Sequence, residues 1–314
     1  FVRAIGTTGE VHTRNSLSLI NVGHRARLTW RDPEQRKLED QWHVPMFGTV
    51  PVGMGMTADA LVERVLAIDR YPPMFAAAFP EDGGEVSVDN IGRALASFQR
   101  TIVGGDSPYD RYLLGDDSAL SAQAIRGLDL FETLGCPSCH GGIFFDQPTD
   151  ASGRVTAEFG YENTGLYNTD GEGAYPEAEQ GLFALTGIST DMGRYRIPSL
   201  RGVAQSGPWS HDGTVLSLAD VLDNYARGGR LVMAGDSPGD GAESPLKSER
   251  LTGFEISNEE RDDIIIFLEA LTDSGLLERD DLATPYCLMV DGVAINEPCE
   301  AWEPLGSSDS SAER

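Results

Sequence analysis

Basic side chains are scarce in this sequence. Its 314 residues include 24 lysines and arginines against 50 aspartates and glutamates, which gives a formal charge of −26 at pH 7. Nucleic acids and anionic membrane surfaces are therefore poor partners, because both would be repelled. No apolar stretch is long enough to span a bilayer, so membrane insertion is not expected. A solvated acidic surface is the simplest interpretation of the charge, although a basic partner protein is compatible with it.

Cysteine is equally scarce, with four in the whole chain. Two of them, Cys287 and Cys299, lie near the C-terminus with eleven residues of turn-rich sequence between them. We expect them to form a disulfide bridge, which would stabilise the fold by about 3 kcal/mol by closing that loop. The sequence begins FVRAIG, without an initiator methionine or a signal-peptide pattern. We therefore expect an upstream segment to have been removed.

The other two cysteines stand in the stretch FETLGCPSCH. Cys136 and Cys139 are followed at once by His140, which makes the C-x-x-C-H pattern of haem c attachment. Two thiols at this spacing can bond to both vinyl groups of a porphyrin, and the adjacent imidazole then lies under the ring as an iron ligand. A thioredoxin-like redox pair would not need the histidine, and a zinc site would need a second Cys/His pair in range. Haem c is attached outside the cytoplasm, where disulfides also persist, so both cysteine pairs predict a periplasmic protein.

Apolar periodicity predicts a mostly α protein, because strand signals are few. Helices are expected to cover residues 88–102 and to begin at four capping residues, which are Thr57, Ser121, Ser217 and Ser257. Pro72 and Pro73 are expected to end the first helix. Some fifty irregular residues follow the C-x-x-C-H motif, and loops of that length would wrap a cofactor.

A chain of this length exceeds the usual size of one core, so two domains are expected. The expected division is an N-terminal domain over residues 1–110, a second domain over 111–275 and a tail over 276–314 that ends in disorder. The Gly- and Asp-rich stretch 104–117 is interpreted as the linker.

The two halves of the chain resemble each other. The sequence SLINVG from Ser18 matches SLRGVA from Ser199, and LED from Leu38 matches LAD from Leu218. The helix ending IGRALASFQRTI also resembles the one ending IIIFLEALT. We interpret the chain as two cytochrome c-like helical domains related by internal duplication, with C-x-x-C-H present only in the second.

The register between the halves predicts an asymmetry. Seven residues beyond Leu38 stands Pro45, and seven residues beyond Leu218 stands Tyr225. Tyrosine can ligate iron through its phenolate, whereas proline has no ligating group. If both positions face a haem, one iron would be held by His140 and Tyr225 and the other would be open on its Pro45 side, where peroxide could bind.

The stretches GCPSCHGG and GRYRIPSLRGVAQSGPWSHDGTVLSLADVLDNYARGG, with RNSLSLIN and LEDQ upstream, resemble the bacterial dihaem cytochrome c peroxidase superfamily from residue 1 to about residue 275. Peroxidases of that superfamily usually carry methionine where this chain has Tyr225. Tyrosine there is similar to the MauG-like branch, and within it to the MbnH group, which converts a partner's tryptophan to kynurenine beside a copper site.

The resemblance implies an enzyme that uses hydrogen peroxide, or O2 plus electrons, to form high-valent haem iron. That iron would oxidise a side chain of a partner protein, here a tryptophan of a small copper-binding protein. Two other functions stay open. One is a hydrogen-peroxide-detoxifying dihaem cytochrome c peroxidase, and the other is a plain electron-transfer cytochrome c without enzymatic activity.

The resemblance also assigns roles to residues. His140 and Tyr225 would be the proximal and distal iron ligands of the second haem, and His211 would lie beside that haem without ligating it. Trp30 would relay electron holes between the haems. Over the open haem lie Gln41, which could hydrogen-bond bound peroxide, and Pro45.

Two features of the family pattern need comment. Gly53 stands where relatives have an acid–base glutamate, and His43 is a candidate substitute for it. The family has two haems c, yet this sequence has one attachment motif, so either the first motif lies upstream or the first half binds no haem. The resemblance further implies a Ca²⁺ site between the domains, formed by Asn15, Ser206 and Pro208.

Overall fold

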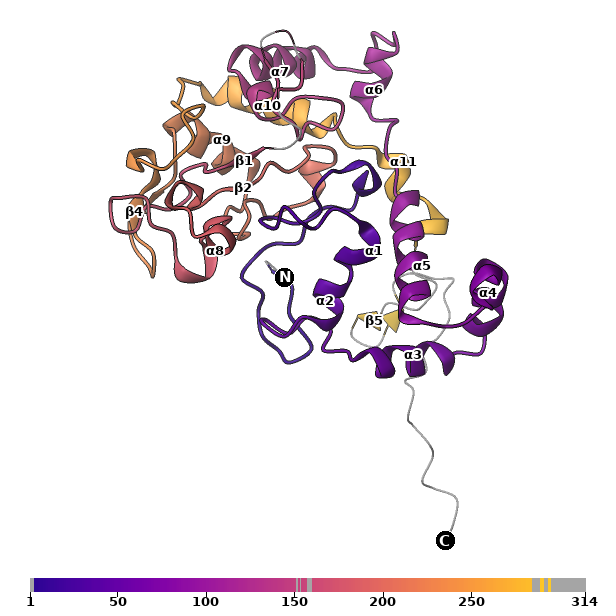
Figure 1. Cartoon of the computed structure of the whole chain (residues 1–314). Coiled ribbons are helices and arrows are strands. Elements are labelled where there is room, and N and C mark those ends of the chain that lie inside the picture. The colour runs from indigo at the N-terminus through magenta and orange to yellow at the C-terminus, as the bar shows by residue number, and fades with distance from the viewer. Residues whose placement is uncertain are drawn as a thin grey trace.

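The computed structural model of this protein describes residues 3–150, 152, 154–156, 160–283, 289–290 and 293–294. Helices dominate this part of the chain, which confirms the mostly α prediction (Figure 1). The α-helices are α1 (Leu38–Gln41), α2 (His43–Phe47), α3 (Ala58–Leu66), α4 (Tyr71–Ala78), α5 (Val88–Thr101), α6 (Pro108–Leu113), α7 (Ala122–Thr133), α8 (Phe183–Thr186), α9 (Leu218–Arg227), α10 (Asn258–Glu269) and α11 (Ser274–Leu277). None of them is long and apolar enough to cross a membrane.

Strands in the described residues are short and pair only in twos. Each of the three ladders is antiparallel and each strand has two residues. The pairs are β1 (Tyr161–Glu162) with β2 (Tyr195–Arg196), β3 (Leu231–Val232) with β4 (Gly239–Asp240), and β5 (Met289–Val290) with β6 (Val293–Ala294). These ladders pin loops together and form no layer of their own.

The predicted helix starts rest on side-chain caps. The hydroxyl groups of Thr57, Ser121, Ser217 and Ser257 each accept the backbone N–H three residues on, at the starts of α3, α7, α9 and α10. At α10 the Glu260 carboxylate also accepts the backbone N–H of Ser257, which completes a capping box. The sequence therefore located these helix starts correctly, because a cap depends only on neighbouring residues.

Two local predictions were incomplete. Pro72 and Pro73 lie in the first turn of α4, so they begin a new helix as well as following the last one. Proline is tolerated there because the first N–H groups of a helix have no partner within the helix. The expected linker 104–117 contains α6, which has its own capping box between Ser107 and Asp110.

The core of the second half lies where α7 crosses α10. Phe131 of α7 packs with Ile264, Phe267 and Leu271 of the α10 region, all of them buried. A Cβ atom at Gly127 would lie 2.0 Å from the Asp263 carbonyl oxygen, so glycine is what lets the two backbones approach. The pair therefore forms a rigid support at the start of the C-x-x-C-H motif, and Figure 1 shows the two helices side by side.

A separate core lies in the first half, among α1 to α5. It consists of the buried side chains Trp42, Leu61, Phe75, Phe79 and Ile91. The segment after α10 returns to this half, because the Asp273 carboxylate accepts the backbone N–H groups of Gly105 and Asp106 at 3.0 and 3.1 Å. The domain boundaries and the duplication stay predictions. The expected disulfide between Cys287 and Cys299 and the expected disordered end lie outside the described residues.

A buried arginine joins α6 to the loop after the C-x-x-C-H motif. The Arg201 guanidinium, 5% exposed, donates to the Asp110 carboxylate at 2.7 Å and to the Ile143 carbonyl at 2.9 and 3.0 Å. Replacing Arg201 by methionine should lower the free energy of unfolding by about 3–5 kcal/mol, because Asp110 would keep its charge without its partner. Urea unfolding of the holoprotein checks this. The control is Arg36→Met, at an exposed pair with Glu34, which should leave the urea midpoint unchanged. An unchanged urea midpoint for Arg201→Met as well would contradict the prediction.

Candidate haem-binding cavity

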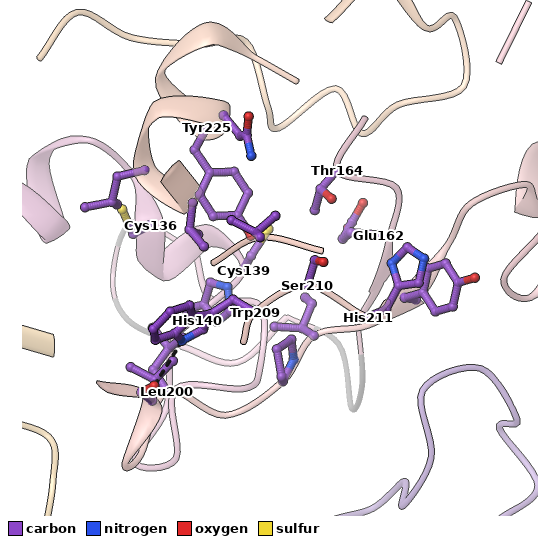
Figure 2. Close-up of a pocket in the computed structure, with 18 of the residues that line it drawn as sticks. Cys136, Cys139, His140, Glu162, Thr164, Leu200, Trp209, Ser210, His211 and Tyr225 are labelled. Carbon is purple, nitrogen blue, oxygen red and sulfur yellow. Dashed lines mark hydrogen bonds between the residues drawn. The ribbon is translucent and has the colours of Figure 1, made fainter. Parts of the chain in front are cut away.

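A cavity of about 310 Å³ opens beside the end of α7. Cys136, Cys139 and His140 line it from the turn after that helix, and Tyr225 lines it from α9. Much of the remaining wall is apolar, from Leu134, Ile197, Val215, Leu218, Leu222 and Ile264. Figure 2 shows the Tyr225 ring pointing from its helix toward the side of the cavity that holds His140 and Cys139. The four predicted haem residues are thus brought together from positions up to 89 apart in sequence, since 225 − 136 = 89.

His140 is held in a form that suits metal ligation. Its Nδ1 lies 3.0 Å from the Phe145 carbonyl oxygen, and a carbonyl only accepts, so Nδ1 carries the proton. Burial lowers the pKa of this imidazole, which keeps the ring neutral. Nε2 then has a free lone pair, which is the arrangement found in metal-bound histidines.

Tyr225 is a half-buried phenol on the cavity wall, and its hydroxyl has no hydrogen-bond partner among the described residues. Burial raises the pKa of its hydroxyl, with smaller contributions from Cys139 and Cys136. No hydrogen bond joins the hydroxyl to any residue that the structure describes. A buried polar group without a partner is costly, so this oxygen is available for a ligand that enters the cavity. A metal cation would also favour the phenolate form.

The surroundings of the two cysteines do not favour a reactive redox pair. Both are free thiols, and burial raises the pKa of Cys136 to about 12 and also raises that of Cys139. Reactive thiol pairs instead have lowered pKa values. A zinc site would need further ligands, and within the described ranges no group of three or more His, Cys, Asp and Glu side chains could hold a metal ion. Both alternatives to haem attachment lose support.

His211 belongs to a buried cluster that sequence reasoning missed. Its ring stacks on Tyr195 with centroids 3.6 Å apart, and the Tyr195 hydroxyl donates to the Glu179 carboxylate at 2.9 Å. His211 Nε2 lies 3.4 Å from the same carboxylate without forming a hydrogen bond. Burial lowers the pKa of His211 and raises that of Glu179. The only sequence signal was that Glu179 and Tyr195 stand in the long loop region where a cofactor was expected.

The predicted relay and calcium residues meet beside this cluster. The Trp30 indole N–H donates to the Asn15 carbonyl at 2.7 Å, and the Asn15 backbone N–H donates to the His211 carbonyl at 2.7 Å. The Asn15 side-chain amide contacts the Pro208 carbonyl, and Ser206 lines the same cavity. Segments 15–30 and 206–211 are therefore adjacent, as the predicted calcium site requires, although the roles of these residues stay predictions.

The residues predicted for the open haem lie elsewhere. Gln41 ends α1 and Pro45 lies within α2, and neither lines the C-x-x-C-H cavity. His43 packs against Trp42 in a tilted arrangement with ring centroids 4.5 Å apart, so it has a packing partner. A Cβ atom at Gly53 would lie 2.3 Å from the Pro45 carbonyl oxygen. A glutamate could therefore not stand at position 53 unless this loop moved away from α2.

The chain is similar to several characterised proteins. The family model for di-haem cytochrome c peroxidase matches residues 2–118. The methylamine utilization protein MauG of Methylorubrum extorquens is 34% identical over 270 residues, which cover 86% of this chain and 67% of the relative. Cytochrome c551 peroxidase of Pseudomonas aeruginosa is 33% identical over 220 residues, covering 70% of this chain and 59% of the relative.

A solved structure shares both fold and sequence. The crystal structure of a MauG-like protein associated with microbial copper homeostasis has a TM-score of 0.84 and 38% sequence identity, and the match covers 90% of this chain and 82% of that chain. Together with the C-x-x-C-H cavity, these likenesses show that the chain belongs to the MauG and dihaem cytochrome c peroxidase family of haem-dependent oxidoreductases.

Proposed function

We propose that this chain works as a MauG-like dihaem c enzyme in the periplasm. It uses hydrogen peroxide, or O2 with electrons, to oxidise a tryptophan side chain of a partner protein. The observation that carries the proposal is one cavity containing C-x-x-C-H, a neutral His140 and an unpartnered Tyr225 hydroxyl. The similar MauG-like protein associated with microbial copper homeostasis supports a small copper-binding partner.

The residues of the cavity fit a haem bound through the two cysteines. When bound, the haem would supply one-electron redox chemistry at its iron. The hydrogen bond between His140 Nδ1 and the Phe145 carbonyl fixes the orientation of the imidazole ring. Nε2 lies on the other side of the ring and stays free to ligate iron. Tyr225 would give up its proton on ligation and hold a hard, anionic oxygen against the iron. Such a ligand favours higher oxidation states and lowers the reduction potential.

We propose that Trp30, which lines this cavity, connects it with the first half of the chain. Its indole ring packs against the buried cluster of Leu166, Tyr175, Tyr195 and Val215. The hydrogen bond from its ring N–H to the Asn15 carbonyl fixes the ring orientation. A tryptophan so fixed at the cavity wall can pass an electron hole without moving, which is the role we propose for it.

The proposal includes another haem in the first half of the chain, with Gln41 and Pro45 over its open face. Support comes from the apolar face of α5. If the two halves are duplicated, Leu95 and Phe98 correspond to Leu268 and Leu271, which are 5% and 1% exposed. The exposed fractions of Leu95 and Phe98 are 36% and 45%. An exposed apolar face of this kind is a place where an apolar group such as a haem could pack. The family model also matches this half of the chain.

A Ca²⁺ ion held by Asn15, Ser206 and Pro208 belongs to the same proposal. Adding calcium to chelator-treated holoprotein should raise its unfolding temperature. At a free calcium concentration one hundred times the dissociation constant, the free energy of unfolding should rise by about 2.7 kcal/mol. Asn15→Ala should lose this response, because the side-chain ligand is gone, whereas Asn258→Ala at the exposed start of α10 should keep it. Differential scanning calorimetry with and without calcium checks the site. An equal calcium response in Asn15→Ala would refute it.

A peroxide-detoxifying cytochrome c peroxidase is the second candidate, because cytochrome c551 peroxidase is also a relative. Mixing holoprotein and peroxide with either a reduced small cytochrome or a tryptophan-containing copper-binding protein separates the two. Our proposal predicts slow cytochrome oxidation and a mass change on one tryptophan peptide of the second partner. Rapid, repeated cytochrome oxidation with an unmodified partner would favour detoxification. Spectra that peroxide leaves unchanged would favour a plain electron carrier.

A further inference from the structure

Two buried arginines line the cavity that contains the C-x-x-C-H motif. The Arg25 side chain is 4% exposed and Arg196 is 6% exposed. Arg196 donates to the carbonyl oxygens of Thr29 at 3.1 Å and Ile197 at 3.3 Å. Arg25 donates through Nη2 to the Ile20 carbonyl at 2.8 Å. These hydrogen bonds to backbone carbonyls fix the orientation of the two guanidinium groups but do not neutralise their positive charges.

The charges at this place do not balance. Asp146 lies 3.6 Å from Arg25 Nη1, and Arg196 forms no ion pair with any carboxylate in the described part of the chain. The Arg25 Nε atom is buried without a hydrogen-bond partner. Burial, and then the neighbouring Arg25, lowers the pKa of Arg196 to about 10. Buried cations are normally paired, so two arginines and the single carboxylate of Asp146 leave an excess of positive charge at a cavity where a bound anion could balance it.

Arg25 and Arg196 come from a different part of the cavity lining than Cys136 and Cys139. Thioether bonds would hold the vinyl edge at Cys136 and Cys139. The backbone carbonyl of Ser138, between those cysteines, accepts from Arg250 at 2.8 Å, so Arg250 marks that edge. A haem carries its two propionates on the opposite edge. Arg25 and Arg196 are bound to residues 20 and 29, in the N-terminal segment that forms another wall of the cavity.

We infer that Arg25 and Arg196 bind the propionates of the haem attached at Cys136 and Cys139. This rests on the haem assignment made above and adds the residues that set the haem's orientation and potential. A guanidinium fork can hold a carboxylate through two parallel hydrogen bonds. The Arg196 backbone N–H also donates to the Trp30 carbonyl at 2.8 Å, so the same residue ties the propionate edge to the proposed relay.

The expected effect of removing these charges is on the haem potential. A buried cation beside the haem favours the reduced iron, because reduction lowers the local positive charge. Arg25→Gln and Arg196→Gln should each lower the midpoint potential, and the double variant should lower it further. Arg25→Lys and Arg196→Lys keep the charge and should stay near the potential of the unchanged protein. Arg36→Gln, 53% exposed at its pair with Glu34 and outside the cavity lining, is the control and should shift the potential little.

The test uses full holoprotein and three readouts. Pyridine haemochrome first gives haem per chain, spectroelectrochemical titration gives the potential, and resonance Raman gives the propionate bending band, which reports hydrogen bonding to the carboxylates. An unchanged potential and band in a fully haem-loaded Arg25→Gln/Arg196→Gln variant would overturn the inference. If the glutamine variants yield no holoprotein, the lysine variants test the inference instead. Loss of the guanidinium fork should still shift the propionate bending band, and an unshifted band in the lysine variants would overturn the inference. Absence of haem from the unchanged protein would instead overturn the proposed function.

Discussion

Replacing Tyr225 by phenylalanine is expected to raise the reduction potential of the haem in the C-x-x-C-H cavity. The rise should be on the order of 0.1 V or more, within the range of about 0.8 V that axial ligands span. The phenolate is anionic and stabilises ferric iron, whereas phenylalanine offers no ligand atom. Haem attachment should stay complete, because the cysteines and His140 are untouched. The variant should also lose the peroxide-generated state that the two haems share.

Spectroelectrochemical titration and electron paramagnetic resonance of the ferric protein measure this effect. Tyr161→Phe is the matched control, because Tyr161 is also a buried phenol whose pKa burial raises and whose hydroxyl has no partner. Tyr161 does not line the cavity, so its variant should keep the potential and the ferric signals. A Tyr225→Phe protein with the potential, the ferric signals and the peroxide response of the unchanged protein would show that Tyr225 is no ligand.

Replacing Cys136 and Cys139 together by serine is expected to abolish covalent haem in this cavity. Both sulfur atoms are free and line the cavity, and no thioether can form without them. The intact mass of the denatured chain should fall by one haem relative to the unchanged protein. Each single variant should retain one thioether and show a shifted pyridine haemochrome band, because one vinyl group stays unreacted.

A second pair of cysteines provides the control for this experiment. Cys287→Ser with Cys299→Ser removes the expected C-terminal disulfide, which lies outside the described residues, and should leave the haem content unchanged. A denatured Cys136→Ser/Cys139→Ser chain that still carries the same haem mass would mean that another segment attaches it. The assignment of the motif would then be wrong.

Much of the local structure could be predicted because its causes are local. The capping residues at positions 57, 121, 217 and 257 each begin a helix, since the cap bond spans only three residues. The C-x-x-C-H motif follows directly after the end of α7, which is also a local feature of the sequence. Helix α6 was missed because Gly and Asp around it resemble a linker, although Ser107 and Asp110 form a capping box within it.

Contacts between distant loops were harder to predict. Glu179, Tyr195 and His211 form a buried cluster from parts of the chain that have no helical period, so periodicity carried no information about them. Periodicity also carried no information about Arg196, which is buried and donates to the carbonyl of the distant residue Thr29. The register argument predicted that Tyr225 faces a haem; Tyr225 lines the C-x-x-C-H cavity, and whether it ligates iron stays a prediction. Gly53 stands against the Pro45 carbonyl, a close approach that no sequence pattern shows.

The central claim is that one iron is held on both faces by this chain, by His140 below and Tyr225 above, while the other haem keeps an open face. The crystal structure of the ferric holoprotein tests this claim most directly. Our account predicts that the Tyr225 hydroxyl oxygen and His140 Nε2 lie within bonding distance of the same iron, on opposite sides of the porphyrin. A Tyr225 oxygen that lies well away from every iron, with water or another side chain as the sixth ligand, would contradict the account.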